Sequence, residues 1–352
     1  MTKVSDALTT LVDERRDLSE AEAYGVLDEI MSGAEVPASQ IGALLTALRM
    51  KGESIDEIVG FARVMREKAV RIVVPGVSRI VDVVGTGGDA PDTFNVSTAA
   101  AFVVAGCGVT VAKHGNRAMS SRCGSADVLE ALGANIELPA SAMAECIREV
   151  GMGFLFAQAY HPAMRFVGPI RRELGFRTVM NILGPLTNPA GTTQMAVGVA
   201  TPEIGEQYAQ VLGRLGSPHA LVVHGQATAD QAGIDEVSPS GPTTVWELKQ
   251  GRVEQYEISP DDFRIRPVSL VAVAGGDAAD NAAAMRAVLG GTTSALTGFV
   301  TMTAATALLA ADEVPTLAEG VSRAAEAIDD GRALRKLELF VETTQRLSVQ
   351  SA

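Results

Sequence analysis

The feature that most constrains the fold is an alternation of short apolar segments and helical patterns between residues 80 and 224. Runs rich in β-branched residues predict the following strands: 80–84, 109–112, 153–157, 194–200 and 220–224. Helical patterns lie between them, and this rhythm predicts right-handed crossovers and a mostly parallel sheet flanked by helices. Two later runs, 243–248 and 253–258, flank a short turn and predict an antiparallel hairpin. The expected fold class is therefore α/β.

The first 70 residues have a different, helical pattern. Ser19 and Ser54 each stand three residues before a glutamate and each precedes an apolar helical repeat, which is the capping-box signature of a helix start. Pro37 precedes a further helix expected at about 39–50. Short loops between such elements predict a compact helical bundle of three or four members.

A chain of 352 residues is long enough for about two domains. We place a small helical domain at residues 1–72 and the α/β domain at residues 73–352, and we expect a later helical segment near 165–190 to pack on the first. Residues 287–311 carry no charge, but six threonines, a serine and three glycines indicate buried core rather than a membrane span. The charged N-terminus predicts no signal peptide.

The charge balance limits the classes of partner. The chain has 29 basic and 42 acidic residues, a net charge of −13, which argues against a nucleic-acid-binding face. It does not exclude small anionic substrates, because a local basic cluster can act inside an acidic protein. Three cysteines are too few for a disulfide scaffold and lack metal-ligand spacing, so we expect a cytoplasmic protein.

A glycine-rich turn follows the first expected strand, with the sequence Val84-Gly85-Thr86-Gly87-Gly88-Asp89. Glycines there let the backbone approach a ligand and direct its N–H groups towards an anion. The relaxed dinucleotide pattern is present, but Pro91 and Asp92 follow where a helix should open, and no acidic residue follows at the required spacing. The phosphate-loop pattern also fails, since no Gly-Lys-Ser/Thr follows. Taken alone, the turn fits a structural role equally well.

Two segments after the turn strengthen an anion-binding interpretation. Asn95-Val96-Ser97-Thr98 precedes an apolar helix expected at 99–105, so Ser97 or Thr98 should lie at a helix N-terminus, where unpaired N–H groups attract phosphate. A plain helix cap remains the alternative for this segment alone. Lys113-His114-Gly115-Asn116-Arg117 then follows the second strand, at the sheet edge where open α/β folds bind ligands.

A second helix is expected at 128–133, with Ser125 as its N-cap and Asp127 in its first turn. Two helix starts, two glycine turns and two cations within about 45 residues predict a polyphosphorylated ligand. Four arginines follow at 165, 171, 172 and 177, and at least one could pair with a substrate carboxylate.

Adjacent carboxylates occur at Asp235 and Glu236, in a loop after the fifth expected strand. Magnesium prefers one or two carboxylates together with substrate phosphates and water. Solvated surface acids are the alternative for this motif alone.

Taken in order, these segments resemble the anthranilate phosphoribosyltransferase family along nearly the whole chain. The matching motifs are Gly85 to Asp89, Asn95 to Thr98, Lys113 to Arg117, Gly124 to Gly133, His161 to Met164, Arg171 to Gly175, Asn181 to Pro189, and Asp235-Glu236. The resemblance implies transfer of a phosphoribosyl group from 5-phosphoribosyl 1-diphosphate (PRPP) to anthranilate in tryptophan biosynthesis. It also implies a homodimer that associates through the helical domain.

The resemblance further implies roles for individual positions. The PRPP site would include Gly85, Gly88, Asp89, Thr93, Asn95, Val96, Ser97, Thr98, Lys113, His114, Gly115, Asn116, Arg117, Ser121 and Ser125. Anthranilate would contact Gly85, Asn116 and Arg171, with Arg171 pairing to its carboxylate. Mg²⁺ would be held by Ser97, Asp235 and Glu236. No single general base is expected.

Some positions depart from the family pattern, and two other functions are alternatives. About five extra residues lie within 226–233, and Cys123 stands where a serine is usual. A pyrimidine nucleoside phosphorylase would carry a Lys-x-Ser-Gly-Arg-like stretch at 113–117, which this chain lacks. A non-catalytic phosphosugar-binding protein would bind PRPP without turnover, and the intact Asp235-Glu236 pair argues against it.

Overall fold

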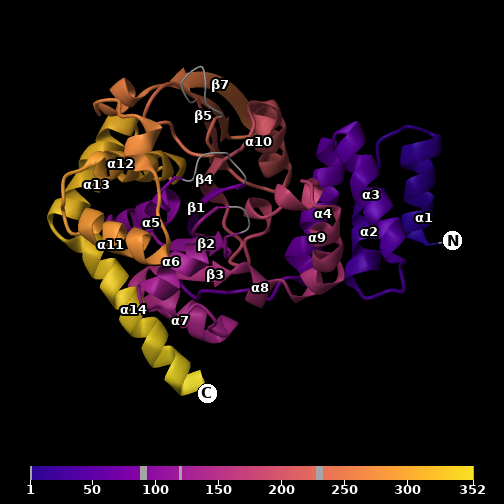
Figure 1. Ribbon diagram of the computed structural model, residues 1–352, viewed down its shortest axis with the longest axis horizontal. Coiled ribbons are helices and arrows are strands. Elements are labelled where there is room, and N and C mark those ends of the chain that lie inside the picture. The colour runs from indigo at the N-terminus through magenta and orange to yellow at the C-terminus, as the bar shows by residue number, and fades with distance from the viewer. Residues whose placement is uncertain (1, 88–92, 119–120, 227–232, 352) are drawn as a thin grey trace.

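The structure is a computed structural model that describes residues 2–87, 93–118, 121–226 and 233–351. A group of N-terminal helices lies at one end, and a sheet covered by helices forms the rest of the molecule (Figure 1). The α/β class with a small helical domain is thus confirmed. Within the described residues, no helix is long and apolar enough to cross a bilayer.

The N-terminal part contains four α-helices and one short π-helical turn. These are α1 (Lys3–Leu8), η1 (Thr9–Asp13), α2 (Glu20–Met31), α3 (Ala38–Lys51) and α4 (Ile55–Lys68). Both predicted capping boxes are present, with Ser19 and Ser54 each exchanging hydrogen bonds with the glutamate three residues later. The predicted helix at 39–50 is also confirmed: α3 extends one residue further at each end.

Among the residues that the structure describes, seven strands form one sheet in the order β3-β2-β1-β4-β5-β6-β7. Their bounds are β1 (Val81–Gly85), β2 (Val111–Gly115), β3 (Met152–Phe156), β4 (Gln194–Gly198), β5 (His219–Gly225), β6 (Thr243–Lys249) and β7 (Arg252–Ile258). The first five strands are parallel, and β6 and β7 form the predicted antiparallel hairpin. The second strand begins two residues later than predicted, after a turn in which Gly108 has a φ of 89°.

Helices cover the sheet on both faces. They are α5 (Val96–Gly106), α6 (Ser125–Ala131), α7 (Ala140–Val150), α8 (Ala157–Tyr160), α9 (Gly168–Leu174), α10 (Gly205–Arg214), α11 (Ala278–Leu289), α12 (Ala295–Ala310), α13 (Leu317–Asp329) and α14 (Arg332–Ser351). Short 3₁₀ turns are η2 (Pro162–Phe166), η3 (Val179–Asn181), η4 (Pro185–Thr187), η5 (Pro202–Ile204), η6 (Pro260–Phe263) and η7 (Leu270–Val273).

Side chains along the central strands alternate between two apolar cores. On β4, Ala196 joins the core that contains α5, whereas Met195 and Val197 join the core shared with the N-terminal helices. Helices α5 and α12 pack on one face of the sheet and α10 packs on the other (Figure 1). Burial on both faces explains why apolar residues predominate along the parallel strands.

The N-terminal helices are attached to the rest of the chain by a shared core and by arginine contacts. Helix α9 packs on α3, and α4 packs on α10. The guanidinium of Arg66, on α4, donates to the carbonyls of Leu186 and Leu215 at 2.6 and 3.1 Å. Arg214, on α10, pairs with Glu20 and with Asp56. The two parts are therefore in continuous contact rather than being joined by a free linker.

Candidate functional site

The strand order places the candidate site at one edge of the sheet. The chain runs from β1 through β2 to β3 on one side, and then crosses to β4 on the other side of β1. In open α/β sheets, ligands bind outside the carboxyl ends of the strands where the order reverses in this way. Gly85 at the end of β1 pairs with Gly198 at the end of β4. The predicted glycine turn therefore begins at the reversal point.

The loop that carries the two adjacent carboxylates packs directly on these glycines. A Cβ added to Gly85 would overlap Oδ2 of Asp235 and lie 2.8 Å from its Cγ. A Cβ added to Gly198 would overlap the backbone carbonyl of Asp235 and lie 3.0 Å from its Cα. Oδ2 of Asp235 also accepts a hydrogen bond from the backbone N–H of Gly87 at 2.7 Å. At Gly198 the backbone of the loop leaves no room for a Cβ, whereas at Gly85 the nearest obstruction is the end of the Asp235 side chain.

Lys113 links this loop to the start of α5. Its ammonium group is buried, with 2% of the residue exposed, and donates to the carbonyl of Val83 at 2.6 Å and to Oγ of Ser97 at 3.2 Å. Burial lowers the pKa of Lys113, while the carboxylates of Asp82, Glu236 and Asp235 act in the opposite direction. A buried cation near three carboxylates and bonded to a hydroxyl makes this edge of the sheet a candidate site for charged ligands.

Helix α5 begins at Val96, three residues earlier than expected, so Ser97 and Thr98 lie in its first turn rather than ahead of it. Asn95 is the N-cap residue, but its side chain donates to the carbonyl of Cys123 at 3.0 Å and accepts from Asn281 at 2.9 Å. These bonds tie the start of α5 to the segment before α6 and to α11. Thr93 pairs with Ala274 through a backbone bridge, which fixes the chain just before the helix. Val96 is buried.

Sequence reasoning missed the polar residues that separate β1 from β2. The pairing of these strands includes only Val81 opposite Val111, whereas β1 and β4 pair along five positions. Beyond that pair, Asp82 accepts from the backbone N–H of His114 at 3.3 Å and from the amide of Asn188 at 2.8 Å. The same amide donates to the carbonyl of Ala112 at 2.8 Å. Side chains thus satisfy the backbone groups that the diverging strands leave unpaired.

Burial controls the ionisation of Asp82, His114 and His161. Asp82 is fully buried, and burial raises its pKa to about 6 even though Lys113 and Asn188 favour the charged form. Burial lowers the pKa of His114 to about 3 and that of His161 to about 4, so both rings are neutral at pH 7. The two rings lie 5.0 Å apart, and Nδ1 of His114 contacts the carbonyl of Gly184 at 3.0 Å. No signal in the sequence distinguished Asp82 from an ordinary strand residue.

The turn after β2 holds Asn116 in a defined orientation. Its Oδ1 accepts from the backbone N–H of Arg117 at 2.8 Å and from Nε2 of Gln158 at 3.3 Å. Its backbone carbonyl accepts from Oγ of Ser125 at 3.2 Å. Gly115 ends β2, where an added Cβ would contact Phe154 at 2.7 Å.

Two predictions for this region need correction or qualification. Ser125 is not the N-cap of α6, because the helix begins at Ser125 and Gly124 is its N-cap; the Ser125 hydroxyl is instead bonded to Asn116. Asp127 does lie in the first turn and accepts from the backbone N–H of Gly124 at 2.9 Å. Arg117 pairs with Glu130 and Asp127, which raises its pKa. Its guanidinium is thus already bound to carboxylates.

Arg171 lies on α9, which packs on α3 of the N-terminal helices. Its side chain is partly buried, which lowers its pKa, and among the described residues it has no hydrogen-bond or ion-pair partner. Three residues further along, Leu174 ends the helix, and Gly175 caps it in a left-handed conformation. Ser121 is exposed. The predicted Gly88, Asp89 and most of the longer loop at 226–233 lie outside the described residues.

The oxygen donors at the loop suit a magnesium ion. In the described part of the chain, no cluster of three or more His, Cys, Asp and Glu residues could bind a metal by itself. Asp235 and Glu236 supply two carboxylates, and Ser97 lies beside Lys113, whose charge both carboxylates influence. Two carboxylates with a hydroxyl leave positions for phosphate oxygens and water, which is the coordination that Mg²⁺ favours.

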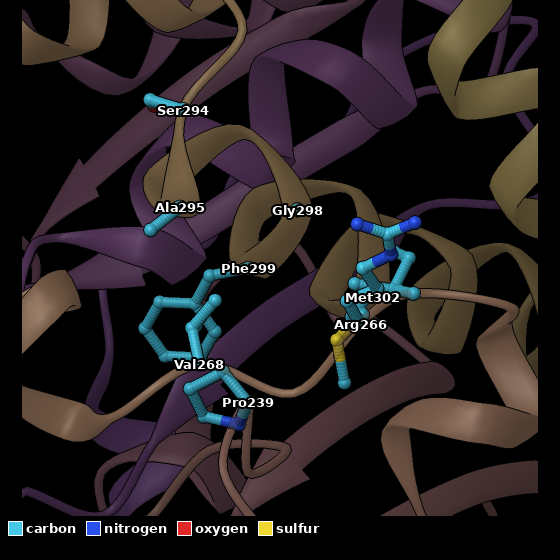
Figure 2. A pocket seen from close by; sticks show the side chains of 9 residues that line it. Pro239, Arg266, Val268, Ser294, Ala295, Gly298, Phe299 and Met302 are labelled. Atoms are coloured by element: carbon cyan, nitrogen blue, oxygen red, sulfur yellow. The ribbon is translucent and has the colours of Figure 1, made fainter.

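A separate cavity of about 260 Å³ lies between the start of α12 and the loop that precedes η7. Figure 2 shows Pro239, Val268 and Phe299 gathered on one side of it, with the guanidinium of Arg266 directed away from them. Its lining includes none of the predicted site residues.

Comparison with known proteins identifies the families and relatives that this chain matches. The family described as "Glycosyl transferase family, a/b domain" matches residues 77–334, and the family described as "Glycosyl transferase family, helical bundle domain" matches residues 5–69. A curated relative from Chloroflexus aurantiacus, named anthranilate phosphoribosyltransferase, is 50% identical over 344 residues, which cover 97% of this chain and 99% of the relative.

Solved structures agree with these matches. The crystal structure of anthranilate phosphoribosyltransferase from Thermus thermophilus superposes with a TM-score of 0.90 at 43% identity, covering 98% of this chain and 100% of that one. The enzyme of that name from Saccharomyces cerevisiae, in complex with PRPP and Mg, superposes with a TM-score of 0.88 at 28% identity, covering 97% and 98% of the two chains.

Proposed function

The chain belongs to the anthranilate phosphoribosyltransferase family, and from this premise we propose that it transfers the 5-phosphoribosyl group of PRPP to the amino group of anthranilate. The products are N-(5-phosphoribosyl)anthranilate and pyrophosphate. One observation supports the proposal most strongly. The glycine turn, the start of α5, the buried Lys113 and the Asp235-Glu236 loop contact one another at one edge of the sheet.

The proposed PRPP site lies along this edge. Ser97 and Thr98 offer the N–H groups and the positive dipole end of α5 to phosphate oxygens. Lys113 contributes a positive charge that the protein has already desolvated, so its attraction for a phosphate is weakly screened. We also assign Gly85, Gly88, Asp89, Thr93, Asn95, Val96, His114, Gly115, Asn116, Arg117, Ser121 and Ser125 to the lining of this site.

The proposed cofactor is Mg²⁺, which the yeast relative contains together with PRPP. Asp235, Glu236 and Ser97 would hold it. When bound, the ion neutralises charge that develops on the departing pyrophosphate. Oδ2 of Asp235 accepts a hydrogen bond from the N–H of Gly87, which holds this carboxylate at the turn where the diphosphate would lie.

The proposed anthranilate site is formed by Gly85, Asn116 and Arg171. Arg171 has no carboxylate partner among the described residues, and partial burial strengthens its attraction for one. Oδ1 of Asn116 is occupied by two donors, which leaves its amide N–H groups as the side that faces a substrate. The buried neutral imidazole of His114 lies two residues from Asn116 and adds no competing charge.

The chemistry needs little proton transfer by the protein. The aromatic amine of anthranilate is neutral at pH 7 and is already a nucleophile. The demanding step is departure of pyrophosphate from C1 of the ribose, with charge increasing on the leaving oxygens. Lys113 and the α5 N–H groups stabilise that charge, while Asn116 and Arg171 hold the amine in position. We therefore propose no covalent intermediate and no single general base.

We extend the proposal to organisation and location. The helical domain would comprise residues 1–72, with residues near 165–190 packed on it, and the α/β domain residues 73–352; the two family matches and the contact between α9 and α3 support this division. We propose a cytoplasmic homodimer that associates through the helical domain. Exposed apolar side chains of Val12 and Met50 support that interface, and Met50→Glu should shift the mass measured by light scattering towards a monomer.

The proposed function is tested by the fluorescence of anthranilate. Its signal should fall only when protein, PRPP and Mg²⁺ are all present, and EDTA should stop the loss. A signal that stays constant in the complete mixture, with PRPP binding intact by calorimetry, would reject anthranilate as the acceptor. Phosphorolysis of thymidine would instead favour a pyrimidine nucleoside phosphorylase, an alternative that no described contact supports.

A further inference from the structure

Both backbone polar groups of Gly87 are bonded to side chains from distant parts of the chain. Its N–H donates to Oδ2 of Asp235 at 2.7 Å, and its carbonyl accepts from Nη2 of Arg177 at 2.7 Å. The partners lie 148 and 90 positions away in the sequence. Gly87 itself has a φ of 73°, a conformation that other residues rarely adopt. The orientation of the Gly87 peptide groups therefore depends on where Arg177 and Asp235 are placed.

Arg177 is held in place by the chain on either side of it. Before it, Gly175 caps α9 and its N–H donates to the carbonyl of Arg171 at 3.3 Å. After it, the backbone N–H of Thr178 donates to Oδ1 of Asn181 at 3.0 Å, at the start of η3. Thr178 is buried. Hydrogen bonds therefore fix the backbone on both sides of Arg177.

The same segment carries the arginine assigned to the anthranilate carboxylate. Arg171 precedes Arg177 by six positions, and α9 packs on α3 of the N-terminal helices. The bond from Arg177 to Gly87 therefore joins the acceptor side of the site to the turn on the PRPP side. An arginine bond to a carbonyl is charge-assisted and is among the stronger hydrogen bonds in proteins.

We propose that Arg177 is a positioning residue that couples anthranilate binding at α9 to the conformation of the Gly87 turn. The inference rests on the proposed function and deepens it. When an acceptor carboxylate draws Arg171 inward, the attached Arg177 holds the carbonyl of Gly87 in the orientation that the diphosphate requires. Because coupling is reciprocal, a bound diphosphate strengthens anthranilate binding by the same factor.

The test uses binding without turnover. The dissociation constant of anthranilate is measured by calorimetry with and without saturating magnesium pyrophosphate, in wild type, Arg177→Met, Arg177→Lys and Arg172→Met. Arg172 is the matched control, because it lies on α9, is exposed, and has no hydrogen bond or ion pair within the described ranges. We expect pyrophosphate to tighten anthranilate binding about fivefold or more in wild type and in the Arg172 variant.

Arg177→Met should reduce the tightening of anthranilate binding by pyrophosphate to less than about twofold. The affinity for anthranilate in the absence of pyrophosphate should be unchanged. Arg177→Lys should recover part of the coupling, since lysine keeps a charged donor. Coupling that persists in Arg177→Met, or that is absent from wild type, would overturn the proposal. A purely structural role would instead weaken anthranilate binding equally with and without pyrophosphate.

A second readout needs no ligand. Hydrogen exchange of peptides that contain Gly87 should be about tenfold faster in Arg177→Met than in the Arg172→Met control, because Gly87 loses one of the two side-chain bonds that hold its backbone among the described residues. Equal exchange in the two variants would show that Arg177 does not hold the turn. If pyrophosphate tightens anthranilate binding but no product forms, the proposed reaction is rejected and the coupling through Arg177 is supported. If anthranilate does not bind to the wild-type protein, the proposed reaction and the coupling are both rejected.

Discussion

Replacing Gly85 by alanine should separate catalysis from folding. The new Cβ would lie 2.8 Å from Cγ of Asp235, whereas ordinary carbon contacts are about 3.5–4.0 Å, so the carboxylate must move by about 1 Å. The Asp235 side chain can rotate away from the new Cβ, and the Asp235 carbonyl, 3.2 Å from it, needs to shift by a few tenths of an ångström. The movement removes the bond from the N–H of Gly87 and displaces a proposed magnesium ligand.

Two magnitudes follow from that displacement. A shift of about 1 Å in a positioned group costs roughly 10²-fold in rate, equivalent to about 2.7 kcal/mol of transition-state stabilisation. Loss of one partly exposed hydrogen bond costs about 1 kcal/mol of folding free energy, because water replaces the partner. Gly85→Ala should therefore melt within a few degrees of wild type and retain about 1% of its kcat/KM, with a raised requirement for Mg²⁺.

Gly198→Ala is the matched contrast. Its Cβ would overlap the backbone carbonyl of Asp235 and lie 3.0 Å from its Cα, so no side-chain rotation relieves the clash. This variant should lose about 3 kcal/mol or more of folding free energy, as overpacked cores do. Thermal denaturation and a magnesium titration of initial rates measure both effects. Gly85→Ala with more than half of the wild-type rate, or with stability as low as Gly198→Ala, would refute the placement of Asp235 on the turn.

Three further predictions concern other parts of the site. Arg171→Met should raise the KM for anthranilate at least about tenfold and leave the KM for PRPP almost unchanged; equal increases would remove Arg171 from the acceptor site. Arg117→Met should change the KM for PRPP by less than about threefold, because the Arg117 guanidinium is paired with Glu130. An increase in this KM as large as that caused by Lys113→Met would show that Arg117 contacts a phosphate of PRPP. The pKa of His161 is lowered by burial to about 4. The unfolded chain therefore binds more protons below pH 6.5, and stability is complete above that pH and falls by up to about 3 kcal/mol towards pH 4. His161→Gln should flatten this loss in urea titrations at several pH values; an unchanged slope would contradict the assignment.

Local patterns predicted the elements of this protein well. Capping boxes at Ser19 and Ser54 and the alternating apolar runs depend on neighbours within a few residues, so the sequence displays them directly. Lys113 was predictable for a related reason, since the end of a strand next to a glycine turn is a local feature.

The missed features depend on contacts between distant segments. Asp82 appears in the sequence as one polar residue in a strand, and its function emerges only when Asn188, 106 positions later, closes the gap between β1 and β2. The expected N-cap at Ser125 was wrong because Asp127 binds the N–H of Gly124, which moves the helix start, while the Ser125 hydroxyl turns to Asn116. Such choices between competing hydrogen-bond partners are decided by tertiary structure.

The proposed function requires that one PRPP and one anthranilate react at this edge of the sheet. Its most direct test is a reaction in which pyrophosphate and N-(5-phosphoribosyl)anthranilate are quantified in the same samples by mass spectrometry. We predict that both products appear in equal amounts, at equal rates, and only with Mg²⁺ present. Pyrophosphate released without the anthranilate adduct, or in the absence of anthranilate at the same rate, would contradict the account.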